Sequence, residues 1–287
     1  MSKRLDIKKT YKMYIGGAFP RSESERYYPL SDKKGTLIAN ICLGSRKDFR
    51  NAVVVARKAF DGWAARSAYN RGQILYRIAE MMEGRKDQLI AELIKEGSSS
   101  KNAAKEVETS IDRVVYFAGW TDKYQQVFGN INPVASSHFN FSTPEPTGVV
   151  SVIAPQKESL LGFIQSTIPV IAGGNVVVVQ ASETKPLATL TFCEILHSSD
   201  VPGGVVNVIS GKTEELASHF SSHMDVNAIL LFEDNQDLKK LVQENASLNV
   251  KAVVHRSVKD FYSEENENPY LILDLQEIKT TWHPVGI

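Results

Sequence analysis

Apolar residues follow two different spacings along this chain, and the change comes near residue 148. In the first part they recur every three or four positions, which is the period of an amphipathic helix. Ser45 and Asp48 have the spacing of a capping box, which predicts that the first of these helices begins beside them. The predicted helices carry their apolar residues within 49–63, 74–82, 89–94 and 107–118, with breaks at Gly84 and at Gly97–Ser100.

Short runs rich in Val and Ile replace this pattern in the second part of the chain. The runs are continuous rather than alternating, and segments with helical spacing separate them, as in a parallel sheet that helices cover on both faces. We therefore expect an α/β fold, a Rossmann-like doubly wound parallel sheet preceded by a helical region. The predicted strands lie at 148–153, 175–181, 205–209, 228–232 and 250–255. After His255 an acidic loop, Ser263–Asn268, precedes strand-like residues from Tyr270 to Ile287.

Composition narrows the class of protein further. The 287 residues suffice for one large or two ordinary domains, and 33 basic residues balance 33 acidic ones. This balance gives no reason to expect nucleic acid or an anionic membrane as a partner. The basic N-terminal stretch lacks an apolar core, no apolar run is long enough to span a bilayer, and Cys42 and Cys193 are far apart. We expect a soluble cytoplasmic protein.

The segment from Pro144 to Pro186 has the frame of a dinucleotide-binding βαβ unit, because a strand, a helix and a second strand follow one another in it. Four motifs stand in the order and at the spacing found in aldehyde dehydrogenases. They are Glu145-Pro146-x-Gly148-Val149, Ile171-Ala172-x-Gly174-Asn175-x-Val177-Val178, Ser182-Glu183-x-x-Pro186-Leu187 and Pro202-x-Gly204-Val205-Val206-Asn207-Val208. The chain therefore resembles the aldehyde dehydrogenase superfamily over roughly residues 10–255. Within it, the chain most resembles the truncated second copy of double-domain members, which lacks a catalytic domain.

The resemblance implies an oxyanion site in the turn after the first strand, and this chain departs from the family pattern there. The family has Pro-Trp-Asn, and the Asn amide holds the thioester oxyanion. Here Pro155 is followed by Gln156 and Lys157. A lysine on a long, flexible stem lacks the preorganisation of a fixed amide.

The positions that hold the dinucleotide in the family also differ. The Lys-Pro-Ser-Glu strand end, which binds the adenosine ribose, is matched by Gln180-Ala181-Ser182-Glu183, so the cation is missing. Ser182 and Glu183 remain as in the family. In the alternative interpretation they do not bind a ribose but form a helix cap before Pro186.

The pyrophosphate position departs most from the family. The family has Phe-Thr-Gly-Ser at the start of a helix whose free amides bind the phosphates. Here Phe232 is followed by Glu233-Asp234-Asn235, so two carboxylates stand where a dianion would bind. Like charges about 4 Å apart repel by about 4 kcal/mol at an effective dielectric near 20. In the alternative interpretation, Asp234 or Asn235 caps the next helix. Both interpretations disfavour the binding of NAD.

Neither catalytic group of the family has a counterpart. The family's general base lies in Leu-Glu-Leu-Gly-Gly, which aligns best with Leu248–Ala252 and places Asn249 at the base position, where it cannot take a proton. Cys193 falls inside a predicted helix and behaves as a small apolar residue, and Cys42 has no base nearby in sequence. We therefore expect no catalytic residue.

His219 and His223 have the spacing of two zinc ligands on one helix face. No third ligand stands near them in sequence, so we expect no metal site.

The residues from Leu275 to Trp282 resemble the family's C-terminal arm, which pairs across a dimer. We expect its partner to be a hairpin of Ser136–Phe141 with Gly148–Ile153. An exposed strand edge of this kind recruits strands from other chains. The alternative is that residues 276–285 pair within their own chain.

These expectations give a domain organisation. Residues 1–135 and 148–262 form the dinucleotide-binding-type domain, residues 136–153 and 270–287 are the oligomerisation elements, and the catalytic domain is absent.

Three functional hypotheses remain open. In the first, the protein is a non-catalytic member that self-associates, as a homodimer, or docks on a full-length aldehyde dehydrogenase. It binds no cofactor, and its vestigial positions are Gln180, Ser182, Glu183, Glu233 and Asp234. In the second, it is an NAD(P)-dependent oxidoreductase subunit whose catalytic half comes from another chain. In the third, Lys157, Gln180 and Glu183 bind a different small ligand.

Overall fold

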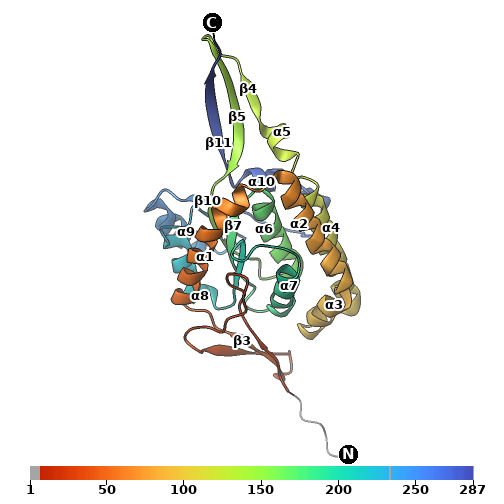
Figure 1. Ribbon diagram of the computed structural model, residues 1–287. Coiled ribbons are helices and arrows are strands. Elements are labelled where there is room, and N and C mark those ends of the chain that lie inside the picture. The colour runs from red at the N-terminus through yellow and green to blue at the C-terminus, as the bar shows by residue number, and fades with distance from the viewer. Residues whose placement is uncertain (1–6, 233, 287) are drawn as a thin grey trace, which may run out of the picture.

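The Val- and Ile-rich runs form a five-stranded, fully parallel sheet at the centre of the protein (Figure 1). The computed structural model describes residues 7–232 and 234–286. The strand order is β10-β9-β6-β7-β8. The strands are β6 (Val149–Ile153), β7 (Val176–Gln180), β8 (Val206–Ile209), β9 (Ala228–Leu231) and β10 (Ala252–His255). Each predicted strand is confirmed within one or two residues at its ends.

Helices cover both faces of this sheet, as predicted for a doubly wound fold. One face carries α6 (Ser159–Ala172) and α7 (Leu187–His197). The other carries α1 (Arg46–Ala64), α8 (Thr213–Ser222) and α9 (Gln236–Ser247). Every residue of β6, β7, β8 and β9 is buried as a result, which explains why these strands are mostly apolar, with Ser151, Gln180 and Asn207 as the polar exceptions.

The remaining N-terminal helices form a second layer outside α6 and α7 (Figure 1). They are α2 (Ala68–Gly84), α3 (Lys86–Lys95) and α4 (Ser100–Ala118). The predicted break at Gly84 is confirmed, and α4 begins at Ser100, the last residue of the predicted loop, with Ser99 as its N-cap.

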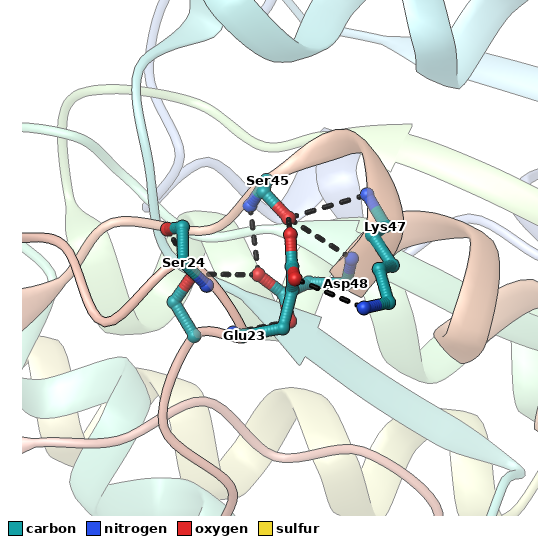
Figure 2. Close-up of polar contacts among 6 residues, drawn as sticks. Glu23, Ser24, Ser45, Lys47 and Asp48 are labelled. Atoms are coloured by element: carbon teal, nitrogen blue, oxygen red, sulfur yellow. Dashed lines mark hydrogen bonds and ion pairs between the residues drawn. The ribbon is translucent and has the colours of Figure 1, made fainter.

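The capping box at the start of α1 is also confirmed (Figure 2). The Ser45 Oγ accepts hydrogen bonds from the backbone of Lys47 (3.2 Å) and Asp48 (3.3 Å), and Asp48 Oδ2 accepts one from Ser45 N (2.9 Å). Asp48 also accepts hydrogen bonds from Ser22 Oγ and Glu23 N, which tie the preceding loop to this helix.

A small sheet lies against one edge of the central sheet. It contains β1 (Thr10–Tyr11), β2 (Tyr27–Ser31) and β3 (Leu37–Cys42) in the order β1-β3-β2. After β1, Tyr14 pairs with Val208, so the outer edge of β8 is covered. Within the described residues, the outer edge of β10 pairs with no strand.

Three antiparallel strands project from the body as an arm (Figure 1). Their order is β11-β5-β4, with β4 (Asn130–Asn132), β5 (His138–Pro146) and β11 (Gln276–Pro284). The short helix α5 (Tyr124–Phe128) leads into β4.

The predicted hairpin of Ser136–Phe141 with Gly148–Ile153 is wrong. β6 lies at the centre of the parallel sheet, because its continuous apolar run needs cover on both faces. β5 continues to Pro146 and pairs with β4 and with β11 of the same chain, so the tail follows the alternative in which residues 276–285 pair within their own chain.

Polar side chains fix the root of the arm to the body. Asn175 Oδ1 accepts a hydrogen bond from Gly148 N (2.8 Å), and its Nδ2 donates to Leu275 O (2.8 Å). Thr147 Oγ1 donates to the same carbonyl (2.9 Å). Gly148 has φ +135°, and a Cβ there would come within 2.3 Å of the Asn227 side chain, so only glycine fits where β5 ends and β6 begins.

Residues 256–275 connect β10 to β11 directly, and we call this segment the strap. It contains a 3-10 turn (Glu264–Asn266) and α10 (Tyr270–Leu273). The fully buried Arg113 of α4 donates hydrogen bonds to Gln165 of α6 (2.5 Å) and to the strap carbonyl of Phe261 (3.4 Å). Gln165 donates to the strap carbonyl of Asn266 (3.0 Å), so two buried side chains hold the strap onto α4 and α6.

Candidate functional site at the carboxyl edge of the sheet

The strand order reverses between β6 and β9, and ligands of open α/β sheets bind outside the carboxyl ends of the strands at such a point. Three segments meet this edge: the turn 154–158 after β6, residues 181–186 after β7, and Phe232, Asp234 and Asn235 after β9. The structure therefore brings Gln156, Gln180 and Asp234 to one edge, as their predicted roles require. Glu233 lies outside the described residues.

The Gln156 side chain links the turn after β6 to the segment after β7. Its Oε1 accepts hydrogen bonds from Glu183 N (2.8 Å) and Ser182 Oγ (3.4 Å), and its Nε2 donates to Ala154 O (3.3 Å). Ser182 Oγ also accepts a hydrogen bond from Lys185 N (3.1 Å), which stabilises the turn before α7. The N-cap of α7 is Pro186, which offers no side-chain cap hydrogen bond, so the alternative interpretation of Ser182 as a helix cap is wrong. These polar groups are bonded to one another.

Gln180 and Glu183 are directed toward the start of α8. Gln180 is fully buried, and its Nε2 donates to Gly211 O (3.1 Å) and Thr213 Oγ1 (2.9 Å). Its Oε1 has no partner among the described residues. Glu183 Oε2 accepts from Thr213 N (3.2 Å), so a carboxylate of the chain occupies the first turn of α8.

Two further glutamates, which the sequence reasoning missed, occupy the other helix starts at this edge. Glu106 of α4 accepts hydrogen bonds from Leu160 N (2.9 Å) and Leu161 N (3.3 Å) in the first turn of α6. Glu96 accepts from Leu187 N at the start of α7 and from Ser159 Oγ (3.3 Å).

Burial raises the pKa of Glu106 and raises that of Glu96 to about 8. A helix start binds anions through its free amides. Two first-turn amides of α6 and the first amide of α7 are thus already bonded to side chains of the protein. The only sign of this arrangement in the sequence was Glu106, a glutamate beside Val107 on the apolar face of α4.

Lys157 is exposed, so the structure does not place it beside Gln180 as part of a closed pocket. The residue after it, Glu158, has φ +41°, which is a left-handed conformation for a non-glycine residue at the start of α6.

At the end of β9, Asp234 and Asn235 have separate roles. Asn235 Oδ1 accepts hydrogen bonds from Asp237 N (3.0 Å) and Leu238 N (3.1 Å), so Asn235 caps α9. Asp234 instead contacts the residues after β10. It accepts a hydrogen bond from Ser257 Oγ (2.8 Å) and lies 3.4 Å from His255 Nε2. Sequence reasoning missed His255, which is the residue at the carboxyl end of β10.

The comparisons with known proteins agree with this architecture. The model of the aldehyde dehydrogenase family matches residues 19–256. The chain belongs to the aldehyde dehydrogenase family.

Several relatives of this family are similar to the chain over most of its length. Cytosolic 10-formyltetrahydrofolate dehydrogenase of Mus musculus is 31% identical over 257 residues, which are 88% of this chain and 28% of that protein. Mitochondrial benzaldehyde dehydrogenase of Antirrhinum majus is 31% identical over 247 residues, which are 84% of this chain and 46% of that protein.

Solved aldehyde dehydrogenases share the fold. A putative aldehyde dehydrogenase of Burkholderia cenocepacia superimposes with a TM-score of 0.82 at 27% identity, over 86% of this chain and 50% of that chain. An NAD⁺ complex of an aldehyde dehydrogenase of Bacillus cereus has a TM-score of 0.81 at 24% identity over the same shares. This aldehyde dehydrogenase chain thus spans about half or less of the length of the relatives that it matches, and the family match ends where the strap begins.

The alignment that places Asn249 at the base position of the aldehyde dehydrogenases does not fit the topology. Asn249 lies in the turn between α9 and β10, at the amino end of that strand, whereas the other predicted site residues lie at carboxyl ends. The neighbouring Val250 has φ +56° and is 94% exposed in the same turn. The sequence pattern missed this because the α9–β10 connection is short and carries no glycine.

The two cysteines and the histidine pair lie away from this edge or inside the core. Cys193 is fully buried within α7, and burial raises the pKa of its thiol. Cys42 is buried at the end of β3, and burial raises its pKa as well. Among the described residues, no three or more His, Cys, Asp and Glu side chains are grouped to hold a metal ion. No helix in the described ranges is long and apolar enough to cross a membrane.

Proposed function

We propose that this aldehyde dehydrogenase family member is non-catalytic and acts through assembly, with a second copy of itself or with a full-length aldehyde dehydrogenase. One contrast carries the proposal. The polar groups at the carboxyl edge are bonded to one another, whereas the arm presents large apolar side chains to solvent.

The hydrogen bonds at the edge disfavour an NAD(P) site. The family's ribose position holds Gln180, whose amide is committed to Gly211 and Thr213, and Glu183, whose carboxylate is committed to Thr213 N. Asp234 adds a negative charge near the pyrophosphate position. Binding a dinucleotide would require these bonds to break and an anion to approach a carboxylate. We therefore propose that the protein works without a nicotinamide cofactor.

The same bonds argue against the repurposed-cleft hypothesis. It required Lys157, Gln180 and Glu183 to line an open cleft together. Gln156 instead fills the space beside Glu183, and Gln180 is fully buried. These contacts disfavour a ligand site formed by Lys157, Gln180 and Glu183.

The strap argues against a subunit that receives its catalytic half from another chain. It lies over α4 and α6, held by Arg113 and Gln165, and it occupies the chain position at which the relatives continue beyond the matched region. A catalytic half from another chain would have to displace it.

Two surfaces are available for assembly. On the arm, Ile131, Phe139, Ile278 and Trp282 are 43–72% exposed, which is unusual for apolar residues on both faces of one small sheet. The second surface lies around α9 and β10, where Leu248 and Val250 are exposed and the strand edge is open. Open edges and exposed apolar side chains are features of interfaces between chains.

The decisive experiment measures the mass of the purified protein by light scattering. We expect an oligomer, and we expect the double substitution Ile278→Ser with Trp282→Ser to shift it toward the monomer. The matched control is Tyr27→Ser, a residue that is 62% exposed on β2 at the opposite end of the molecule. An oligomer of unchanged mass in the arm variant would remove the arm from the proposal.

Deleting residues 276–287 is a second test of the same role. The arm contacts the body mainly at its root, so we expect the body to remain folded by circular dichroism while the apparent mass falls. Loss of the folded state would show that the arm stabilises the body instead.

Co-expression separates the two kinds of partner. If the wild-type protein is monomeric alone, it should co-purify with a full-length aldehyde dehydrogenase, and the arm variant should not. Turnover of aldehydes by the purified protein with NAD or NADP would overturn the non-catalytic assignment.

A further inference from the structure

A hollow of about 500 Å³ lies between the first two turns of α1 and the C-terminal end of α8. Four basic side chains line it in two pairs. Arg46 and Arg50 are one turn apart on α1, and His219 and His223 are one turn apart at the end of α8. Residues four apart lie on the same helix face, so each pair faces the other helix.

The packing of the two helices fixes this arrangement. Phe49 stacks on Phe220 with ring centroids 4.2 Å apart and contacts the edge of the His223 ring at 5.7 Å. His223 Nδ1 accepts a hydrogen bond from Asp225 N (3.2 Å), which orients the imidazole. The ring of His223 is therefore held in position beside α1.

The positive charge of the hollow is not neutralised by ion pairs. Within the described part of the chain, the side chains of Arg46 and Arg50 have neither a salt bridge nor a hydrogen bond. Burial lowers the pKa of His219, and the positive charge of Arg46 lowers it further by a smaller amount. Burial also lowers the pKa of His223. The negative charge of Asp225 raises this pKa, whereas the positive charges of Lys251 and Arg50 lower it further. The surroundings thus favour an anion over a further cation.

The rest of the lining matches a phosphate in particular. The hydroxyls of Ser218 and Ser222 lie beside the basic groups, and they can donate hydrogen bonds to phosphate oxygens. Guanidinium groups bind phosphate with two parallel hydrogen bonds. Phe49 and Met224 supply an apolar wall for the remainder of a ligand.

We propose that this hollow binds the phosphate group of a small phosphorylated molecule, with Arg46 and Arg50 as its main ligands and His219 and His223 as further donors. The site is separate from the carboxyl edge, because the ten residues of α8 place its two ends about 15 Å apart. It does not depend on the proposed assembly function.

Calorimetric titration of the full chain with inorganic phosphate tests the site. We expect saturable binding to the wild type at millimolar phosphate. Arg50→Gln should weaken it about tenfold, since one charge-assisted hydrogen-bonding group is lost. Arg46→Gln with Arg50→Gln should abolish it. The matched control is Arg77→Gln on α2, an exposed arginine paired with Glu80 outside the hollow.

Imidazole NMR resonances give a second, local measurement. Bound phosphate should raise the pKa of His219 and His223, because an anion beside the rings opposes the effects of Arg46 and Arg50. Circular dichroism shows whether the double variant is folded. The proposal is overturned if the wild type shows no saturable binding, or if the double variant binds phosphate as well as the control does. Binding of an acidic peptide without binding of phosphate would equally overturn it.

Discussion

Gln180 holds the end of β7 to the start of α8. In the family a lysine here binds a ribose, whereas this chain has a neutral amide that is fully buried. The amide donates to a backbone carbonyl and to a hydroxyl of its own chain. A residue that bound a ligand in the family therefore connects two structural elements in this protein.

Substitution of Gln180 by Ala should destabilise the protein by about 1–3 kcal/mol, because Gly211 O and Thr213 Oγ1 lose their buried donor. Urea denaturation followed by circular dichroism measures the change. Gln126→Ala is the matched control, since Gln126 is exposed and bonds only to Asp122 O. Equal stability of the two variants would show that the Gln180 bonds contribute little.

Glu96 makes stability depend on pH. Its pKa is raised from an ordinary value near 4.5 to about 8 by burial. The folded state therefore holds a proton that the unfolded state releases between these values, so stability is highest below the unfolded pKa and falls as pH rises through the folded pKa. The slope is on the order of 1 kcal/mol per unit of pH across that interval.

The substitution Glu96→Gln should remove much of this fall. We expect the unfolding free energies of wild type and variant to converge near about pH 5 and to diverge by about pH 8, with the variant the more stable. Urea titrations at these two values measure it, and Glu80→Gln, an exposed glutamate, is the control. Parallel pH profiles would contradict the raised pKa.

At the scale of elements, sequence patterns predicted those parts of the fold that depend on local periodicity. The strands of the central sheet are continuous apolar runs, and the capping box marks the start of α1 through its own side chains. Pairing between distant segments has no such local signal. The resemblance to the family did assign Ser136–Phe141 to the partner of the tail, but across a dimer. The chain pattern did not reveal that β5 runs to Pro146 and pairs with β11 of the same chain, or that the polar strap carries its buried contacts through backbone carbonyls.

The same limit applied to the candidate site. The substitutions at Gln156, Gln180 and Asp234 could be read from the motifs, and the structure brings them to one edge. Glu96 and Glu106 could not be identified, because their partners are backbone amides of α6 and α7 that lie far away in sequence. Short motifs also misplaced Asn249, since a match of a few residues does not say on which end of a strand it falls.

The strap should stabilise the protein measurably. Arg113→Met keeps much of the side-chain volume but removes the bonds to Gln165 and to the strap carbonyl of Phe261. We expect a loss of about 2–3 kcal/mol, as for hydrogen bonds from a charged group. Chemical denaturation measures it, with Arg77→Met as the exposed control. If both variants lose equally little, the hydrogen bonds of Arg113 contribute little to holding the strap.

For the whole molecule, the family membership and the closed edge lead to opposite expectations about dinucleotides. Members of the fold have been solved with NAD⁺, whereas the groups at this edge are bonded to one another. We expect calorimetric titration with NAD or NADP at millimolar concentration to show no saturable binding. Saturable binding would restore the hypothesis that another chain supplies the catalytic half.

The arm also sets the order in which the chain can fold. Ser142 of β5 and Thr280 of β11 share a hydrogen bond although they are 138 residues apart. Closing so long a loop costs entropy that only later contacts recover, so this pairing forms late. During synthesis, β5 is complete long before β11 leaves the ribosome, so the edge of β5 that pairs with β11 in the finished protein stays open during that interval.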